Sequence, residues 1–237
     1  KLDILDEAKY CHLYKSNRQL FRNIWFNGRV GRVNEFDMLH EDIYSSMKNA
    51  DILGIPYESW IRHEYSIGSA NGISSLTNIV RFLADNPIRP DIEFCDQNVH
   101  FLLAHLPFFD RLFKMEKQFE VISCHRDIGE HIAKRFNLRN VRIHKIPSEG
   151  AYTNMIGDGA DERFHYPDVF MQIRESIQSR SCAGRVFIVS AGYLGKIYCN
   201  DVKIAGGVAL DLGSIADGWM GVNTRPGMEN VPVLSPS

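Results

Sequence analysis

The sequence lacks the features that most directly reveal a protein's class. Its five cysteines form no C-x-x-C pair, and no apolar run approaches the roughly 20 residues that span a bilayer. The net charge is only −2 over 237 residues, which gives no sign of a general nucleic-acid or membrane-surface binder. We therefore expect a reduced, cytosolic setting, no nucleic-acid partner and no transmembrane segment.

Common catalytic and metal motifs are missing as well. Without an H-E-x-x-H pattern we expect no dedicated zinc site, and there is no G-x-S-x-G nucleophile elbow. The chain has no signal peptide and does not begin with methionine, which suggests a piece of a longer protein. We expect one domain, with a helical part at 1–49, a core at 50–225 and a tail at 226–237.

What the sequence does contain is a series of short apolar strands that alternate with helices. This alternation predicts a parallel sheet covered on both faces, and right-handed crossovers make it a doubly wound α/β sandwich. Ligands of such folds bind at the carboxyl ends of the strands. We expect strands at 50–56, 92–95, 121–124, 141–147, 186–190 and 208–212, and helices at 10–25, 36–48, 74–85, from 99 onward, 128–136, 167–178 and 194–202.

A glycine turn, S-A-G-Y-L-G-K at 190–196, follows one strand and opens a helix. Gly192 and Gly195 would let the backbone approach an anion at a helix N-terminus, where negative charge is favoured, and Lys196 adds a full charge. The turn is neither a P-loop nor a dinucleotide fingerprint, because Ser190 stands where the first glycine belongs. The alternative is a plain strand-to-helix turn with an exposed lysine.

Two further strand ends carry polar residues. His125 and Arg126 follow the strand at 121–124, and both are suitable partners for a phosphate or diphosphate; the alternative is a helix cap with a solvated arginine. Ser148 and Glu149 follow the strand at 141–147, where they would bind a ribose or sugar hydroxyl or form an ordinary polar loop.

The segment after the last strand, 207–221, is the most unusual. Asp211 and Asp217 place two carboxylates near a strand's carboxyl end, where they could bind a divalent ion, take a proton or contact sugar hydroxyls. Trp219 could stack on a sugar or a base. The alternative is that both aspartates cap turns while Trp219 fills the core.

The second half of the chain resembles the GT-D-fold glycosyltransferases of bacterial polysaccharide and glycoprotein assembly, over about residues 50–225. Its most specific part is S-A-G-x-x-G-K followed shortly by A-L-D-L-G-S-x-x-D-x-W. Three other segments add to the resemblance: H-R-D at 125–127, I-P-S-E-G-A-Y at 146–152 and H-Y-P-D-V-F at 165–170.

The resemblance implies a Rossmann-like enzyme that uses a nucleotide sugar, typically UDP-linked, with Mn²⁺ neutralising the diphosphate. It implies a cytoplasmic protein that acts on a glycan or glycoprotein acceptor, with partners or further domains that associate it with the inner face of the membrane. Asp211 and Asp217 would face the sugar, one of them as the acceptor's base. The residues implied in nucleotide-sugar binding are Ser190, Gly192, Gly195, Lys196, His125, Arg126, Glu149 and Trp219.

The sequence departs from this family at the metal site. The family's R-x-G-D-G-E segment, whose acids bind the metal, is not found here. The remaining candidates for metal ligands are Asp6, Glu7 and Glu35. Two other functions therefore stay open: a non-catalytic domain that binds a nucleotide sugar or a partner within a larger enzyme, and an α/β enzyme that binds a sugar phosphate.

Overall fold

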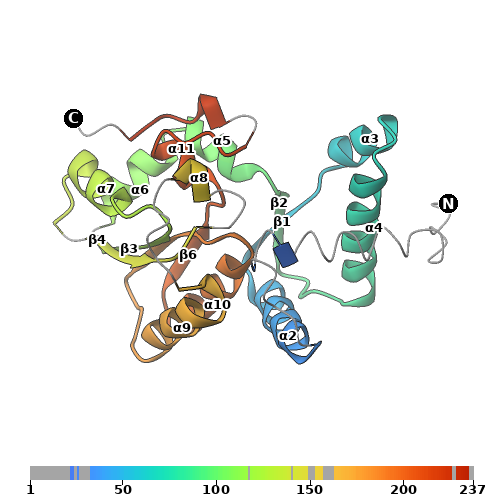
Figure 1. Cartoon of the computed structure of the whole chain (residues 1–237), viewed down its shortest axis with the longest axis horizontal. Coiled ribbons are helices and arrows are strands. Elements are labelled where there is room, and N and C mark those ends of the chain that lie inside the picture. The colour runs from blue at the N-terminus through green and yellow to red at the C-terminus, as the bar shows by residue number, and fades with distance from the viewer. Residues whose placement is uncertain are drawn as a thin grey trace.

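The structure is a computed structural model that describes residues 22–23, 26, 33–116, 118–139, 141–148, 153–156, 163–225 and 228–234. Two parallel sheets organise it (Figure 1). The strands are β1 (Ile52–Ile55), β2 (Glu93–Asp96), β3 (Phe119–Ser123), β4 (Val141–Lys145), β5 (Val186–Ser190) and β6 (Val208–Asp211). The longer helices are α2 (Val33–Asn49), α3 (Glu58–Ser66), α4 (Ala70–Asp85), α5 (Val99–His105), α6 (Phe108–Met115), α7 (Ile128–Phe136), α9 (Phe170–Gln178) and α10 (Gly195–Ile204), and the short ones are α8 (Thr153–Ile156) and α11 (Ile215–Trp219).

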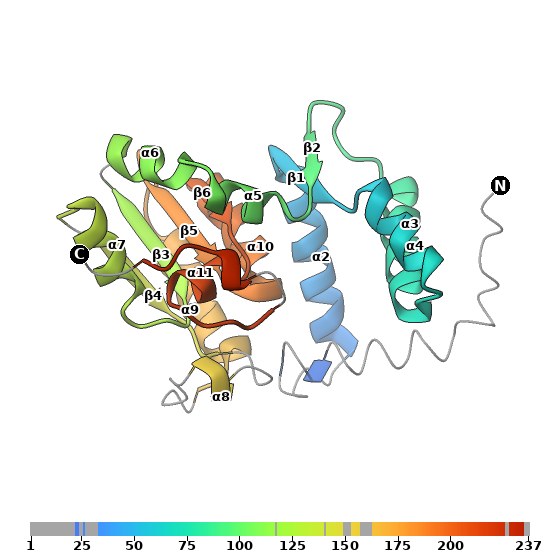
Figure 2. The same cartoon turned by 90° about the horizontal axis from the view of Figure 1, so that it is seen from above.

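The larger sheet has four parallel strands in the order β4-β3-β5-β6. From β3 the chain moves outward through α7 to β4, and then returns through α9 to β5 on the other side of β3 (Figure 2). This reversal leaves a switch point between the carboxyl ends of β3 and β5. In open parallel sheets, ligands bind in the crevice at such a point.

Helices cover both faces of this sheet. Ile122 and Phe187 pack with apolar residues of α9 and α10 on one face, and Val121 and Ile188 pack with residues of α6, α7 and α11 on the other. All ten residues of β3 and β5 are buried, which is why both strands read as apolar runs in the sequence. The predicted α/β fold, doubly wound with a mostly parallel sheet and helices on both faces, is confirmed and is consistent with a Rossmann-like fold.

The strands β1 and β2 do not join the large sheet, although the sequence suggested one sheet. They pair with each other, in parallel, as a second sheet. Ile52 is 62% exposed and Phe94 is 53% exposed, so neither strand is covered on both faces. Figure 2 shows this small sheet, with α3 and α4 beyond it, to one side of the four-stranded sheet. Each strand is only four residues long, and both contain exposed residues, whereas all residues of β3 and β5 are buried.

The predicted helices at 36–48, 74–85, 128–136, 167–178 and 194–202 are confirmed as α2, α4, α7, α9 and α10. The helix expected from residue 99 is two helices, α5 and α6, because Leu106 precedes a proline and takes an extended conformation, as residues before proline tend to do. The helices α3, α8 and α11 were not predicted, and most of the helix expected at 10–25 lies outside the described residues.

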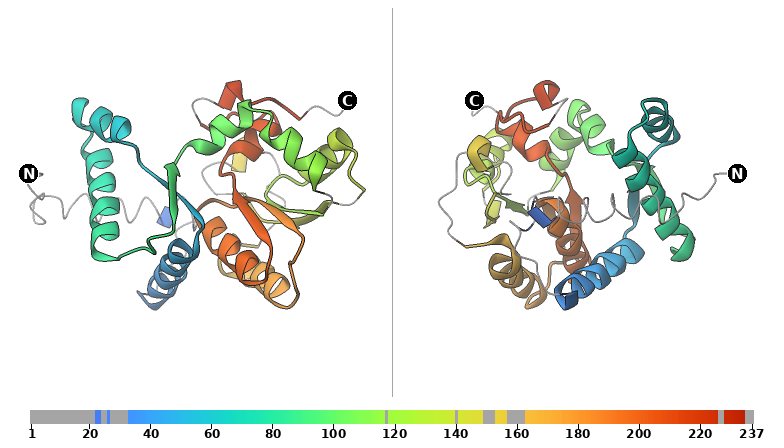
Figure 3. Two further views of the ribbon diagram at one scale, coloured as in Figure 1. Left: turned by 180° about the vertical axis from the view of Figure 1, so that it is seen from behind. Right: turned by 45° about the vertical axis from the view of Figure 1, so that its right-hand side comes forward.

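The helix α2 lies against α10, and polar bonds join them (Figure 3). Arg174 of α9 donates to Asp42 of α2 at 2.8 Å and to Asp201 of α10 at 2.8 and 3.2 Å. Lys203 donates to the carbonyl of Asn49 and to the carboxylate of Asp51, both at 2.6 Å. In the described part of the chain, none of the helices is both long and apolar enough to cross a membrane.

Candidate functional site

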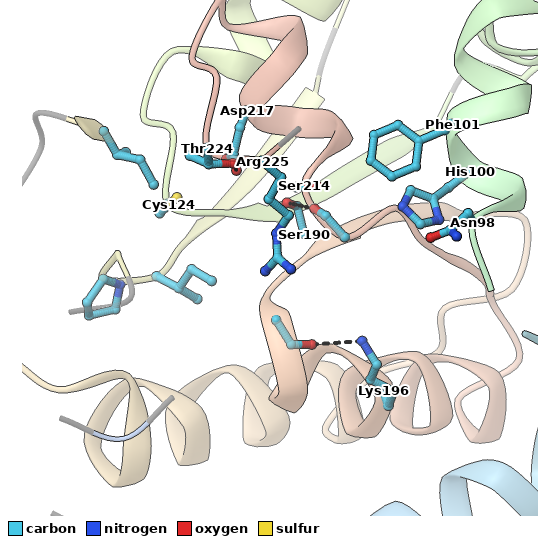
Figure 4. Close-up of a pocket in the computed structure, with 15 residues that line it drawn as sticks. Asn98, His100, Phe101, Cys124, Ser190, Lys196, Ser214, Asp217, Thr224 and Arg225 are labelled. Atoms are coloured by element: carbon cyan, nitrogen blue, oxygen red, sulfur yellow. Dashed lines mark hydrogen bonds between the residues drawn. The ribbon is translucent and has the colours of Figure 1, made fainter. Parts of the chain in front are cut away.

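A pocket of about 320 Å³ lies at the switch point of the four-stranded sheet (Figure 4). Its walls come from the segments that follow the carboxyl ends of β2, β3, β4, β5 and β6. The lining residues that matter most here are Ser190, Gly192, Lys196, Asp217, Thr224 and Arg225. The sequence placed its candidate chemistry after these strands, and the structure brings much of it to this one cavity.

The glycine turn forms one wall of the pocket. Gly192 has a φ of +54°, a conformation that glycine adopts without steric cost, and a short 3₁₀ turn at Gly192–Leu194 leads into α10. A Cβ on Gly195 would lie 3.2 Å from Cγ1 of Val189, so glycine allows the helix to start close against β5. The N-terminal end of α10 therefore sits directly at the pocket, as the sequence predicted.

Lys196 lines the pocket and is held by two neighbours. Its Nζ lies 2.8 Å from Oδ2 of Asp211 and donates to the carbonyl of Gly192 at 3.0 Å. Oδ1 of Asp211 accepts from the backbone N–H of Gly213 at 3.2 Å. Asp211 thus orients both the lysine and the turn after β6, and it is not among the lining residues itself.

The turns after β5 and β6 are joined by Ser190. Its hydroxyl donates to the carbonyl of Gly213, whose φ is +52°. Position 213 also lies close to the wall from α5, because a Cβ there would be 3.7 Å from Nε2 of His100. That distance is an ordinary van der Waals contact, so the reason for glycine here is its positive φ, at which a side chain would be strained.

Opposite the lysine, His125 and Asp217 form a buried pair. Nε2 of His125 lies 2.7 Å from Oδ1 of Asp217, and the hydroxyl of Thr224 donates to Oδ2 of Asp217 at 2.6 Å. His125 is only 6% exposed, and its backbone N–H donates to the hydroxyl of Ser123 at 3.2 Å. Both carboxylate oxygens of Asp217 are therefore engaged, and the carboxylate has one fixed orientation at the edge of the pocket.

Several lining residues were not singled out from the sequence, among them Asn98, His100, Thr224 and Arg225. In Figure 4 the guanidinium of Arg225 extends into the space between Ser190 and Lys196, and His100 faces this space from α5. Burial lowers the pKa of His100, and the positive charges of Lys196 and Arg225 lower it further, while Asp211 opposes them. The pocket thus holds a lysine, an arginine and an imidazole whose pKa lies below its ordinary value.

Several predicted residues do not reach this pocket. Trp219 is a correction: it is 3% exposed and packs edge-on against Phe109 at 5.0 Å, inside the apolar layer beneath α11, so it offers no free face to a sugar. Arg126 is exposed and is not among the lining residues. Glu149, Asp6 and Glu7 lie outside the described residues. Glu35 belongs to α2, but its side chain is not among those the structure describes.

The manganese expected from the family resemblance finds no fitting ligand set in the described ranges. There, the side chains of metal-ligand type that gather closely are Cys124, His125 and Asp217, with ligand atoms within 4.8 Å of one another. Manganese prefers carboxylate, carbonyl and water oxygens, whereas a thiol and an imidazole are ligands of softer ions. We therefore derive no manganese chemistry from this cluster.

Comparison with known proteins does not place the site in a family. No protein-family model, curated protein or solved structure matches the chain. The chemistry of the site is therefore the guide to its function: Lys196 at the N-terminal end of α10, Arg225 from the segment after α11, and the fixed carboxylate of Asp217. Such an arrangement can hold a phosphate-bearing ligand and accept a proton next to it.

Proposed function

We propose that the chain is a glycosyltransferase that transfers a sugar from a nucleotide diphosphate sugar, with UDP as the expected nucleotide, to a glycan or glycoprotein acceptor. The observation that carries the proposal is that Lys196, Arg225 and Asp217 all line one pocket at the switch point. The resemblance of the sequence to GT-D-fold enzymes supports it. Surface-polysaccharide or glycoprotein assembly at the cytoplasmic side of the membrane would be its setting.

The donor would lie with its diphosphate near Lys196 and Arg225. When the bond between the sugar and the phosphate breaks, the diphosphate leaves with added negative charge. Fixed cations and backbone N–H groups at a helix N-terminus stabilise such charge where it develops. Lys196 comes from α10 and Arg225 from the segment after α11, so the leaving group would be held from two sides.

The different surroundings of the two aspartates support a different proposed role for each. Asp211 is bonded to Lys196 and to the backbone of Gly213, so we propose it as a positioning residue for the cation. Asp217 lines the pocket, so we propose it as the base that accepts the proton of the acceptor hydroxyl. His125 and Thr224 would hold its carboxylate in place during that step.

The proposal is tested with a panel of UDP-, GDP-, CDP- and dTDP-sugars. Binding is measured by calorimetry, and turnover is measured as release of the nucleoside diphosphate in the presence of candidate acceptors. We expect one nucleotide class to bind and to be turned over. Lys196→Ala is expected to weaken binding by about 10- to 100-fold, as for the loss of one charged hydrogen bond. Asp217→Asn is expected to abolish turnover while binding remains.

Lys134→Ala is the matched control. Lys134 is an exposed lysine in the last turn of α7 and is not a lining residue, so its loss should leave both measurements unchanged. Unchanged donor affinity in Lys196→Ala would refute the diphosphate position. Donor binding without any turnover would favour the non-catalytic binding domain, and selective binding of sugar phosphates would favour the sugar-phosphate enzyme.

A further inference from the structure

The three residues Cys124, His125 and Asp217 bring a thiol, an imidazole and a carboxylate within 4.8 Å of one another. They come from two distant parts of the chain: the first two follow β3 directly, and the third belongs to α11. A search for local metal motifs cannot find such a set, because 92 positions separate His125 from Asp217. The sequence accordingly gave no expectation of a zinc site.

The chemistry of this set is that of a zinc-type ion. Thiolate and imidazole bind Zn²⁺ and Co²⁺, whereas Mg²⁺ and Mn²⁺ prefer oxygen ligands. A thiolate, a carboxylate and a neutral imidazole together carry two negative charges, which match one divalent cation. Zinc bonds of about 2.0–2.3 Å place tetrahedral ligand atoms roughly 3.5 Å apart. The ligand atoms now lie within 4.8 Å of one another, so to reach this geometry the longest of their distances would shorten by at most roughly 1 Å. The 2.7 Å distance between Nε2 of His125 and Oδ1 of Asp217 would lengthen.

The surroundings are those of a site with one open position. His125 and Asp217 are buried, while Cys124 and Asp217 also line the pocket, so a fourth ligand could enter from the pocket side. The hydroxyl of Thr224 donates to the second oxygen of Asp217 at 2.6 Å. Outer hydrogen bonds of this kind orient metal ligands and strengthen binding.

We propose that Cys124, His125 and Asp217 form a binding site for one zinc-type divalent ion at the edge of the pocket. Binding releases the thiol proton of Cys124 to solvent. The neutral imidazole of His125 then carries its proton on Nδ1, which leaves the lone pair of Nε2 for the ion. Oδ1 of Asp217 is the third protein ligand, and the pocket side supplies the fourth position.

This site goes beyond the proposed transferase activity and does not depend on it. If both are present, they compete, because Asp217 cannot hold the ion and accept a proton at once. A zinc-type ion would then inhibit transfer.

The test uses the full chain, stripped of metal with a chelator, kept reduced without added thiols and titrated with Co²⁺ as the spectroscopic probe. We expect equimolar binding, with a thiolate-to-cobalt charge-transfer band and the intense visible bands of tetrahedral cobalt. Zn²⁺ should remove these bands and Mn²⁺ should not. Cys124→Ser and His125→Gln should each eliminate the tetrahedral spectrum, and Thr224→Val should lower affinity by about 10- to 100-fold.

Cys95→Ser is the control, because Cys95 is a partly buried cysteine on β2, away from the cluster. Its spectrum should equal that of the unchanged protein, and circular dichroism checks that every variant folds. The proposal fails if no equimolar binding occurs, if the bands are those of octahedral cobalt, or if the charge-transfer band survives in Cys124→Ser. Since no sugar donor is used, such a failure leaves the proposed transferase function untouched.

Discussion

The two ends of the four-stranded sheet handle charge in opposite ways. Near the amino end, the carboxylate of Glu120 on β3 is completely buried and is surrounded by basic partners. Just beyond the carboxyl end of the same strand, His125 pairs with Asp217 at a pocket that also holds Lys196 and Arg225. At the amino end the charged groups are bonded to one another, whereas at the carboxyl end they lie at a cavity.

The bonds to Glu120 show how closed the amino end is. Arg180 donates to both of its carboxylate oxygens, one of them at 2.7 Å, and Arg185 donates to one at 3.2 Å. His144 lies 2.6 Å from Oε2. Burial raises the pKa of Glu120, but the hydrogen bonds and charges of His144 and Arg180 outweigh burial and lower it to about 2. The carboxylate therefore remains ionised and joins β3, β4 and the connection between α9 and β5.

The comparison teaches that a buried charge alone does not mark a function. A buried charge whose oxygens are already bonded to fixed protein partners has no further capacity for a ligand, so its role is structural. A charge that lines a pocket lies where a ligand can reach it, and binding and catalysis occur at such places. We expect changes at the amino end to alter stability and changes at the carboxyl end to alter binding.

The largest expected effect comes from Glu120→Gln. The substitution leaves Arg180 and Arg185 without their buried counter-charge, so the free energy of unfolding should fall by about 3–5 kcal/mol. Urea denaturation measures this loss. Glu116→Gln, at an exposed position after α6, should change stability by less than about 0.5 kcal/mol. Equal effects in the two variants would contradict a structural role for the buried carboxylate of Glu120.

The second-largest expected effect is a loss of stability at low pH, which acts through Glu120 at the amino end of the sheet. The pKa of Glu120 in the folded protein is about 2, below its ordinary value of 4.5, so the unfolded chain takes up the proton first as the pH falls. The contribution of Glu120 to stability is complete above pH 4.5 and is lost as the pH drops from about 4.5 toward 2. Urea midpoints across this window should fall less steeply in Glu120→Gln than in the unchanged protein.

Arg225→Ala tests the carboxyl end of the sheet, where we expect binding to change and stability to stay the same. The residue is exposed and lines the pocket, so its removal should leave the free energy of unfolding within about 0.5 kcal/mol. UDP affinity should fall by about 10- to 100-fold, the loss for one charged hydrogen bond. Calorimetry with UDP and urea denaturation of the same variant measure the two quantities. A large loss of stability with unchanged UDP affinity would contradict a binding role for the carboxyl end of the sheet.

The smallest expected effect is a titration shift at His100. Burial lowers its pKa below 6.5 in the free protein, and Lys196 and Arg225 lower it further. A bound diphosphate brings negative charge and favours the protonated imidazole, so the pKa of His100 should rise on binding. UDP affinity should then increase as the pH falls through the interval between the pKa of His100 in the UDP-bound protein and its pKa in the free protein. NMR of the His100 ring with and without UDP measures the shift, and identical titration curves would contradict a diphosphate in this pocket.

Most of the fold could be predicted from hydrophobic pattern. The apolar runs of β3 and β5 identified strands that are buried on both faces, and the alternation with helices identified the doubly wound arrangement. The pairing of β1 with β2 alone could not be predicted, because a four-residue apolar segment does not say which strand lies beside it. The short helix α11 was missed because its five residues are too few for a helical period to show.

The site could be predicted where chemistry follows a strand directly. Ser190, Gly192, Lys196 and Asp217 were found in this way, and all four line the pocket. Arg225 and His100 were not found, because they reach the pocket from segments whose direction only the tertiary structure fixes. Trp219 was placed wrongly, since a tryptophan beside two aspartates has the same sequence pattern whether its ring faces a ligand or the core.

The lining residues are spread widely along the sequence, which has a consequence for folding during synthesis. The pocket draws on positions from Asn98 to Arg225, and a ribosome extends the chain from the N-terminus at about 5–20 residues per second. A nascent chain that stops before Arg225 can already contain β3, β4, β5 and β6 but lacks the second cation. If the pocket binds the proposed donor through both cations, the donor can stabilise only a protein whose synthesis has passed this residue.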